Sequence, residues 1–213
     1  VVVTLAMTTG TLEIGTYTFT NVDSSNPTAT DIVVIKYNTT GDLQWAIHLK
    51  GDGNCAVETT YALSDNGVAL VVYTQERTVS IGATVLFTSV NFSALRRYYY
   101  LLKLTAQGAF GWVQHMDNSD NRLKSSGVHN GYLYICGFIY SNQTPRSLTL
   151  GGITISPTKT YGYYARVKVS DGAVSYLKAM EASGGFLLHR LVVTSSGLHL
   201  IGDFGANSTI QST

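Results

Sequence analysis

The sequence predicts an all-β chain, an array of about three four-stranded antiparallel units, from two observations. Three phrases each recur with a period of 64–69 residues. Strand-forming and turn-forming residues dominate the composition, and no stretch has the sustained 3.6-residue periodicity of a helix. A fixed period of this length indicates that each unit is one supersecondary element stacked on its neighbours.

The clearest phrase joins a lysine to an aromatic residue across a turn glycine. It reads KYNTTGDLQW at 36–45, KLTAQGAFGW at 103–112 and KVSDGAVSY at 168–176. A second phrase places a glycine before an apolar strand, and a third reads LEIG, VSIG and LTLG. We predict that the anchors of the first phrase are structural, with the aromatic side chains in the core. These anchors are Gly41, Gly108, Gly172, Trp45, Trp112 and Tyr176.

Four strands are expected in the best-defined unit, at 59–64, 68–74, 98–105 and 109–116. Asp65-Asn66-Gly67 separates the first pair and Ala106-Gln107-Gly108 the last pair, as is typical of antiparallel hairpins. The longer connections at 75–97 and 139–161 carry the third phrase, and we expect a short additional β-segment in each.

Such units are typical of β-propeller blades, which are small twisted antiparallel sheets. The segment DIVVIKY at 31–37, followed by Gly41, Trp45 and Gly51-Asp52-Gly53, resembles the bacterial-type β-propeller repeat family (seven-bladed β-propeller-like repeats). That resemblance implies an extracellular or surface-exposed protein whose repeat carries no catalytic motif. It covers nearly the whole chain and departs in the later units, where Tyr176 replaces the tryptophan.

The phasing predicts a single array over residues 1–213. The expected parts are a partial blade at 1–54, blades at 55–117 and 118–181, and a partial blade at 182–213. Closed propellers have about 4 to 8 blades. Three cannot close a ring, so we expect either part of a larger propeller or an open arc completed by another molecule.

The low charge of the chain limits the classes of partner that it is expected to bind. Charged residues make up 13% of the chain and the net charge is +1, which gives no field for binding nucleic acid, and no apolar run is long enough to span a membrane. The polar uncharged surface and four N-x-S/T sequons favour a secreted or cell-surface protein. The candidate glycosylation sites are Asn38, Asn91, Asn142 and Asn207.

Residues that could carry chemistry have simpler structural interpretations. The repeated Lys36, Lys103 and Lys168 are expected to pack their stems on strands, with the ammonium groups in solvent. Of the five histidines, His48 and His115 occupy equivalent strand positions, and His129, His189 and His199 lack metal-ligand spacing. The segments 51–54 and 117–121 match no calcium loop and are expected to cap turns. For Cys55 and Cys136 we expect buried free thiols, with a mutual disulfide as the alternative.

The sequence therefore predicts no catalytic residues, no cofactor and no metal. The expected function is that of a non-enzymatic extracellular structural or adhesive module, with self-assembly into a filament or surface layer. Its expected partners are further copies, other surface proteins or glycans. The alternative is a carbohydrate- or ligand-binding propeller, in which exposed tyrosines of the segments 98–100 and 161–164 stack on sugar rings.

Overall fold

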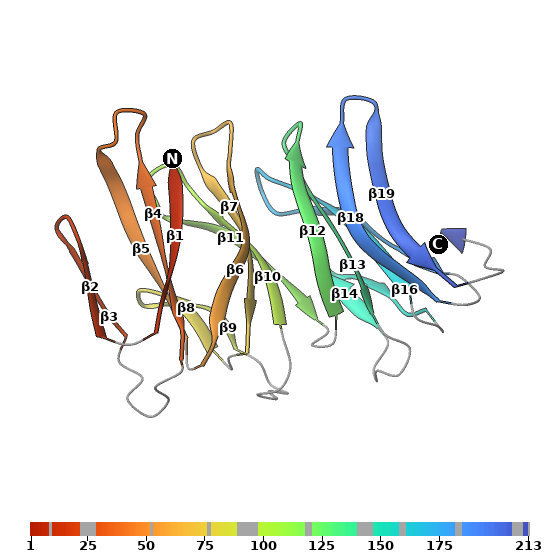
Figure 1. Ribbon diagram of the computed structural model, residues 1–213, viewed down its shortest axis with the longest axis horizontal. Helices are drawn as coiled ribbons and strands as arrows, with labels where there is room; N and C mark the ends of the chain where they lie inside the picture. The colour runs from red at the N-terminus through yellow and green to blue at the C-terminus, as the bar shows by residue number, and fades with distance from the viewer. Residues whose placement is uncertain are drawn as a thin grey trace. The chain divides into compact units, whose positions relative to one another are not determined.

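The computed structural model describes residues 1–8, 10–21, 29–51, 53–75, 78–88, 98–117, 121–139, 147–157, 161–181, 185–205 and 211–212. These residues form strands and turns and contain no helix (Figure 1). The ladders between the strands are antiparallel, so the predicted all-β, antiparallel fold is confirmed. The chain divides into two compact units, Val1–Val113 and Gln114–Thr213.

The first unit contains two sheets and a separate hairpin. One sheet has the strand order β1-β4-β5-β8-β9, the second runs β6-β7-β10-β11, and β2 pairs with β3. Strand β11 begins in this unit and ends in the next. The strands are β1 (Val2–Met7), β2 (Gly10–Ile14), β3 (Tyr17–Asn21), β4 (Asp31–Tyr37), β5 (Leu43–Gly51), β6 (Cys55–Ala62), β7 (Val68–Thr74), β8 (Thr78–Ile81), β9 (Thr84–Thr88), β10 (Tyr98–Leu104) and β11 (Phe110–Asp117).

The second unit contains one larger sheet and two hairpins. The sheet has the strand order β12-β13-β16-β17-β20, and β18 pairs with β19. The hairpin β14–β15 joins the end of β11, where Met116 pairs with Leu150. The strands are β12 (Asn121–His129), β13 (Tyr132–Ile139), β14 (Leu148–Leu150), β15 (Ile153–Ile155), β16 (Tyr161–Lys168), β17 (Val174–Glu181), β18 (Phe186–Thr194), β19 (Gly197–Phe204) and β20 (Gln211–Ser212).

Strands in the middle of the sheets are buried on both faces. All seven residues of β10 are buried, as are six of the seven in β7, which explains why their sequences do not alternate between apolar and polar residues. In the first unit, side chains of β4, β5, β7 and β10 form one core cluster that includes Trp45, Leu70 and Leu102. In the second unit, Cys136 of β13 packs with Phe186, Leu188 and Leu191 of β18.

The three copies of the third phrase adopt one hairpin conformation. Each phrase ends at a turn glycine with positive φ, 59° at Gly15, 56° at Gly82 and 56° at Gly151, a conformation that glycine adopts without the usual steric cost. The hairpins are β2–β3, β8–β9 and β14–β15. The predicted extra β-segments in the long connections are therefore confirmed at β8 and β14.

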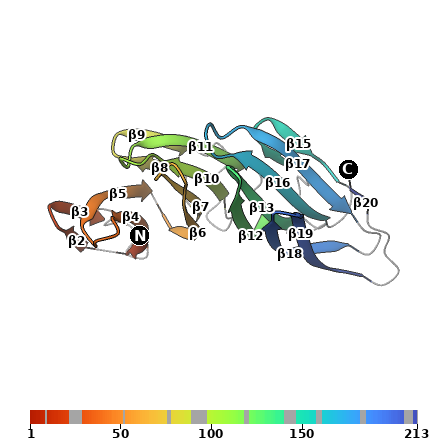
Figure 2. The ribbon, with the colours of Figure 1, turned by 90° about the horizontal axis from the view of Figure 1, so that it is seen from above.

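Two of these hairpins, β8–β9 and β14–β15, extend sheets to which their sequence neighbours do not belong. Strand β8 lies between β7 and β10 in the chain, yet it pairs with β5, with Lys50 opposite Ser80 (Figure 2). Strand β14 pairs with the end of β11 in the same register, with Asp117 opposite Thr149. Strand β20 pairs with β17 likewise, with Glu181 opposite Gln211. The edges of β5, β11 and β17 are thus each covered by a short strand from further along the chain.

The strand boundaries agree closely with expectation. The predicted strands at 59–64, 68–74, 98–105 and 109–116 correspond to β6, β7, β10 and β11. The largest difference is at β6, which begins at Cys55 because it pairs with β7 as far as Thr74. The division at 1–54, 55–117, 118–181 and 182–213 remains a prediction.

Candidate functional site

One face of β4 and β5 carries donors that reach turn carbonyls of the adjacent sheet in the first unit. The ammonium of Lys36 donates to the carbonyl oxygens of Asn66 (2.5 Å) and Ala106 (3.3 Å). The indole N–H of Trp45 donates to the same Ala106 oxygen at 2.9 Å. Lys36 and Trp45 are opposite each other in the β4–β5 ladder, which places both donors on one face. We call this pair the first donor row.

The turn that receives the first donor row requires glycine. Gly108 has φ +82°, and a Cβ there would lie 2.9 Å from Cδ2 of the Trp45 ring. The turn glycine therefore allows both the backbone conformation and the close approach of the tryptophan. Trp45 is 5% exposed and Trp112 is 9% exposed, so both repeated tryptophans are core residues.

A second side-chain bond of this kind lies in the second unit. The amide Nε2 of Gln114, on β11, donates to the carbonyl oxygen of Gly172 at 3.0 Å. Gly172 belongs to the turn between β16 and β17, which corresponds in sequence to the turn that contains Ala106. The same turn therefore accepts a side-chain N–H in both places.

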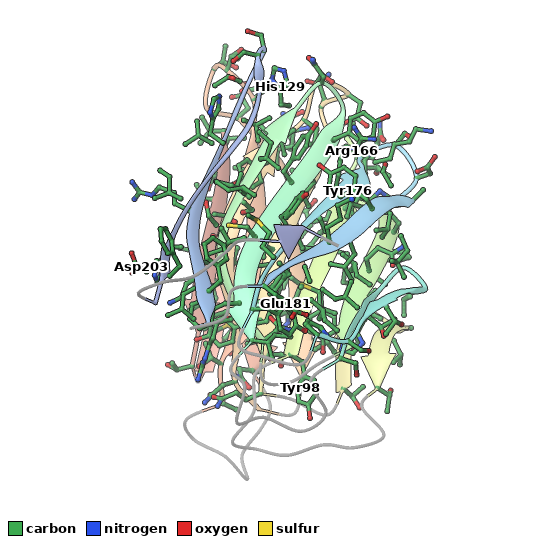
Figure 3. The ribbon with its side chains drawn as sticks, turned by 90° about the vertical axis from the view of Figure 1, so that its right-hand side faces the viewer. Tyr98, His129, Arg166, Tyr176, Glu181 and Asp203 are labelled. Atoms are coloured by element: carbon green, nitrogen blue, oxygen red, sulfur yellow. The ribbon has the colours of Figure 1, made fainter. Side chains whose placement is uncertain are left out.

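A third donor row, Arg166 and Tyr176 with Tyr132 on β13, β16 and β17, differs because the buried Arg166 Nε has no acceptor among the described residues. The guanidinium carbon of Arg166 lies 4.5 Å from the ring centroid of Tyr132 and 5.1 Å from that of Tyr176 (Figure 3). Its Nε is buried and has no hydrogen-bond partner in the part of the chain that the structure describes. An unsatisfied buried donor costs about 1–3 kcal/mol, which the two cation–π contacts, each about 0.5–2 kcal/mol, offset.

Half-buried tyrosines surround this arginine. Tyr134 lies opposite Arg166 in the β13–β16 ladder, and the rings of Tyr164 and Tyr176 are 5.7 Å apart, edge to face. Burial raises the pKa of Tyr176, and the Arg166 charge acts in the opposite direction. We call the set Tyr132, Tyr134, Tyr164, Arg166 and Tyr176 the tyrosine–arginine face. Aromatic rings with an arginine between them are the residue types that dominate binding hot spots.

The repeated lysines have separate partners, which corrects the expectation of a solvent-exposed ammonium group for Lys36 and Lys103 and agrees with it for Lys168. Lys36 bonds two carbonyls, Lys103 is buried and bonds the Asp65 carboxylate at 2.5 Å, and only Lys168 is exposed. The Lys103 hydrogen bond lowers the pKa of Asp65, helped by the backbone N–H of Gly67. Lys168 bonds Asp171 at 2.9 Å, which lowers the pKa of that carboxyl and raises that of the lysine.

A buried histidine–aspartate pair lies on the opposite face of β4 and β5. The imidazole Nε2 of His48 is 2.7 Å from Oδ2 of Asp31, and both side chains are 6% exposed. The second carboxylate oxygen accepts the backbone N–H of Gly51, and the Phe19 ring meets the imidazole edge-on. Together these contacts tie β4 to β5 and to Phe19 of the β2–β3 hairpin.

The remaining candidate residues have the following positions. His189 contacts Asp203 on the exposed hairpin β18–β19. No cluster of three or more metal-ligating His, Cys, Asp or Glu side chains occurs among the described residues. Cys55 and Cys136 are both buried and are not joined by a disulfide, as expected, and burial raises the pKa of the Cys136 thiol to about 12.

The expected sugar-stacking tyrosines are mostly inaccessible. Tyr98, Tyr99 and Tyr100 are 6%, 1% and 3% exposed, and Tyr161 and Tyr163 are fully buried. The expectation that these segments expose tyrosines is therefore wrong, except for the half-buried Tyr164. Both segments lie on central strands with a partner on each side, where both faces are buried.

Three of the four sequons, at Asn91, Asn142 and Asn207, lie outside the described residues. Asn38 is in the β4–β5 turn, where its side-chain oxygen accepts the backbone N–H groups of Thr40 and Asp42. Its side-chain amide donates to the Asp42 carboxylate at 2.8 Å. A glycan at Asn38 requires part of this turn network to open.

Sequence reasoning missed Arg166, although a signal was present. The residue two positions before the repeated lysine is Val34 in the first copy, Leu101 in the second and Arg166 in the third. Val34 and Leu101 are both fully buried. A charged residue at an otherwise apolar position of the same phrase marks a place where the environment of that face has changed.

Comparison with known proteins gives no relative on which to base a function. No protein-family model matches the chain, and no curated protein is significantly similar to it. Among the described residues, no helix has the length and apolar character needed to cross a membrane.

Proposed function

We propose that the chain is a non-enzymatic structural or adhesive module of the β-propeller type, secreted or displayed at a cell surface, that associates with further copies of itself. One observation carries the proposal: hydrogen-bonding groups that could serve chemistry are used to hold sheets together. Lys36, Trp45 and Gln114 all donate to turn carbonyls. The His48–Asp31 pair joins two strands of one sheet.

The exchange of short segments between sheets supports the same proposal. Strands β8, β14 and β20 each extend the edge of a strand from an earlier part of the chain, in one register. Because of this pairing, each sheet is completed by a strand from a later part of the sequence. It is the arrangement expected of an array in which units are added in series.

Exposed apolar side chains support association with another molecule. Ile201 and Phe204 of β19 are 56% and 57% exposed, and β19 pairs only with β18 among the described residues. Strand β1 pairs only with β4 within the same described set, and its Leu5 is exposed. Open strand edges with apolar side chains favour pairing with a further strand.

Sedimentation velocity over a concentration series tests the proposal. Association that grows with concentration at micromolar levels is expected, whereas a chain that stays monomeric throughout contradicts self-association. The second candidate is carbohydrate binding at the tyrosine–arginine face, favoured by its half-buried rings. Specific binding of the monomeric chain to a glycan array would support this candidate.

A further inference from the structure

Donors on the strands that carry the lysine-to-aromatic phrase bond carbonyls in the turns of that phrase at two places in the described chain, and one of these donors, Gln114, lies two residues after the second copy. Lys36 and Trp45 bond the carbonyl of Ala106, and Gln114 bonds that of Gly172. On the donor side, the row that remains is the tyrosine–arginine face, where the Arg166 Nε has no acceptor within the described ranges. The chain therefore contains one unmatched donor row in its described part.

One turn that could accept a side-chain hydrogen bond also receives none within the described residues. The β4–β5 turn is equivalent in sequence to the two turns that accept side-chain donors, and Thr39 occupies the position of Ala106, two residues before the turn glycine. Thr39, Thr40 and Gly41 are exposed. No hydrogen bond to the Thr39 or Thr40 carbonyl occurs within the part of the chain that is described. The Asn38 and Asp42 side chains hold the turn in shape without using these oxygens.

From this complementarity we infer that the tyrosine–arginine face binds the Asn38–Asp42 turn of a second copy of the chain. Because the Arg166 Nε is buried, the terminal NH2 groups of this partly exposed side chain donate to the exposed turn carbonyls, as Lys36 and Trp45 do to Ala106 in the first unit. Tyr132 and Tyr176 hold the planar guanidinium in position and pack on the turn backbone. This inference rests on the proposed self-association and specifies its contact.

The chemistry of the two surfaces fits such a contact. Lys168 beside Arg166 is paired with Asp171 at 2.9 Å, so the Arg166 guanidinium supplies the positive charge of this face, and Asp42 brings a carboxylate to the turn. The hydrogen bonds of Thr40 and Asn38 lower the pKa of Asp42. Because the two surfaces differ, the contact is heterologous, and it builds a ring or a filament.

Cysteine cross-linking in mixtures of two variants tests the contact directly. The chain carrying Thr39→Cys is mixed with the chain carrying Lys168→Cys under mild oxidation. Both positions are exposed, and the native Cys55 and Cys136 are buried and do not compete. Glu58→Cys, exposed on β6, replaces Lys168→Cys in the control mixture. We expect a disulfide-linked heterodimer from the first mixture, and equal yields from the two mixtures would overturn the inference.

A second measurement keeps the inference testable if the cysteine variants fold poorly. Arg166→Leu installs the residue found at the equivalent position 101 and deletes the donor. We expect self-association to weaken about tenfold or more, as for loss of a charged hydrogen bond at an interface. Thr39→Arg places like charges opposite each other and has the same effect, while Thr84→Arg, at another exposed threonine, leaves association unchanged. Circular dichroism and thermal unfolding of each variant confirm that it is folded.

The outcomes separate this contact from the proposed function. A wild-type chain that is monomeric at all concentrations overturns both. A wild-type chain that associates, with Arg166→Leu and Thr39→Arg associating equally well, overturns the contact and leaves self-association standing. A monomeric chain that binds glycans, and loses that binding in Arg166→Leu, assigns the face to carbohydrate instead.

Discussion

The first donor row and the tyrosine–arginine face are two versions of one feature in different surroundings. Lys36 and Trp45 have a turn to bond, and Trp45 is buried. Arg166 and Tyr176 occupy the corresponding strands β16 and β17, yet Tyr176 is only half-buried and the Arg166 Nε has no acceptor among the described residues. The comparison teaches that the same phrase stabilises the fold where a turn covers it, and we propose that it binds another molecule at Arg166 and Tyr176, beyond Tyr134 and Tyr164, which pack against β18.

The largest expected effect comes from removing the repeated aromatic residues. Trp45→Ala and Trp112→Ala should each lower the free energy of unfolding by about 3–5 kcal/mol, because each leaves a large cavity in a core. Tyr176→Ala should cost only about 1–2 kcal/mol, since its ring is half-exposed and less apolar area is lost. Urea unfolding of the three variants measures this, and an equal loss at Tyr176 would show that its face is covered.

Alanine at two turn glycines separates backbone strain from packing. Gly41 has φ +89° and no atom lies within 4 Å of the place that an alanine Cβ would take, so Gly41→Ala should cost about 1 kcal/mol from strain alone. Gly108→Ala has a similar φ and also pushes against Trp45, which adds about 1–3 kcal/mol. Thermal unfolding of the two variants gives the difference. Identical losses would mean that Trp45 does not press on this turn.

Removing the donor side chain should affect stability differently at Lys36 and at Arg166. Lys36→Met loses the bonds to Asn66 and Ala106, so stability should fall by about 1–2 kcal/mol. Arg166→Leu removes an unsatisfied donor together with its cation–π contacts, so stability should change by less than about 1 kcal/mol. Denaturation at a concentration where the chain is monomeric checks this. A loss at Arg166 as large as that at Lys36 would indicate an acceptor within the same chain.

The smallest expected effect is the pH dependence of the stability that the Asp65–Lys103 pair contributes. The Lys103 hydrogen bond lowers the pKa of Asp65 in the folded chain, so this pair stabilises the fold above the ordinary carboxyl pKa of 3.8. That contribution is lost as the pH falls through the lowered pKa, which lies below 3.8. The stability difference between wild type and Asp65→Asn should therefore shrink in acid. A difference that stays constant would show that the carboxylate charge is not involved.

The sequence predicts strands and turns well because both depend on local pattern. Glycine before each apolar strand and the Asp65-Asn66-Gly67 turn place β6 and β7 nearly correctly. The partner of each extra hairpin could not be predicted, because β8 pairs with β5 across the intervening strands β6 and β7. The predicted exposure of Tyr98–Tyr100 is wrong, since a run of aromatic residues looks alike on a central strand and on a surface.

Only part of the candidate site could be predicted from the sequence. The sequence identifies three aromatic anchors, Trp45, Trp112 and Tyr176. It does not show which of them a turn covers, as the turn at Ala106 covers Trp45, because that depends on tertiary packing. Arg166 stands out only when its copy is compared with Val34 and Leu101. The cation–π pairs with Tyr132 and Tyr176 depend on strand register, which the repeat alone does not specify.

The most direct test compares hydrogen exchange at two side-chain N–H groups as the protein concentration is raised. The Trp45 indole N–H is bonded to Ala106 and should be protected at every concentration. The terminal NH2 groups of the partly exposed Arg166 side chain should exchange faster in dilute monomer than in associated protein, because the Asn38–Asp42 turn of a second copy then accepts hydrogen bonds from them. Arg166 NH2 groups whose exchange does not slow in fully associated protein would contradict the account, as would rapid exchange at Trp45.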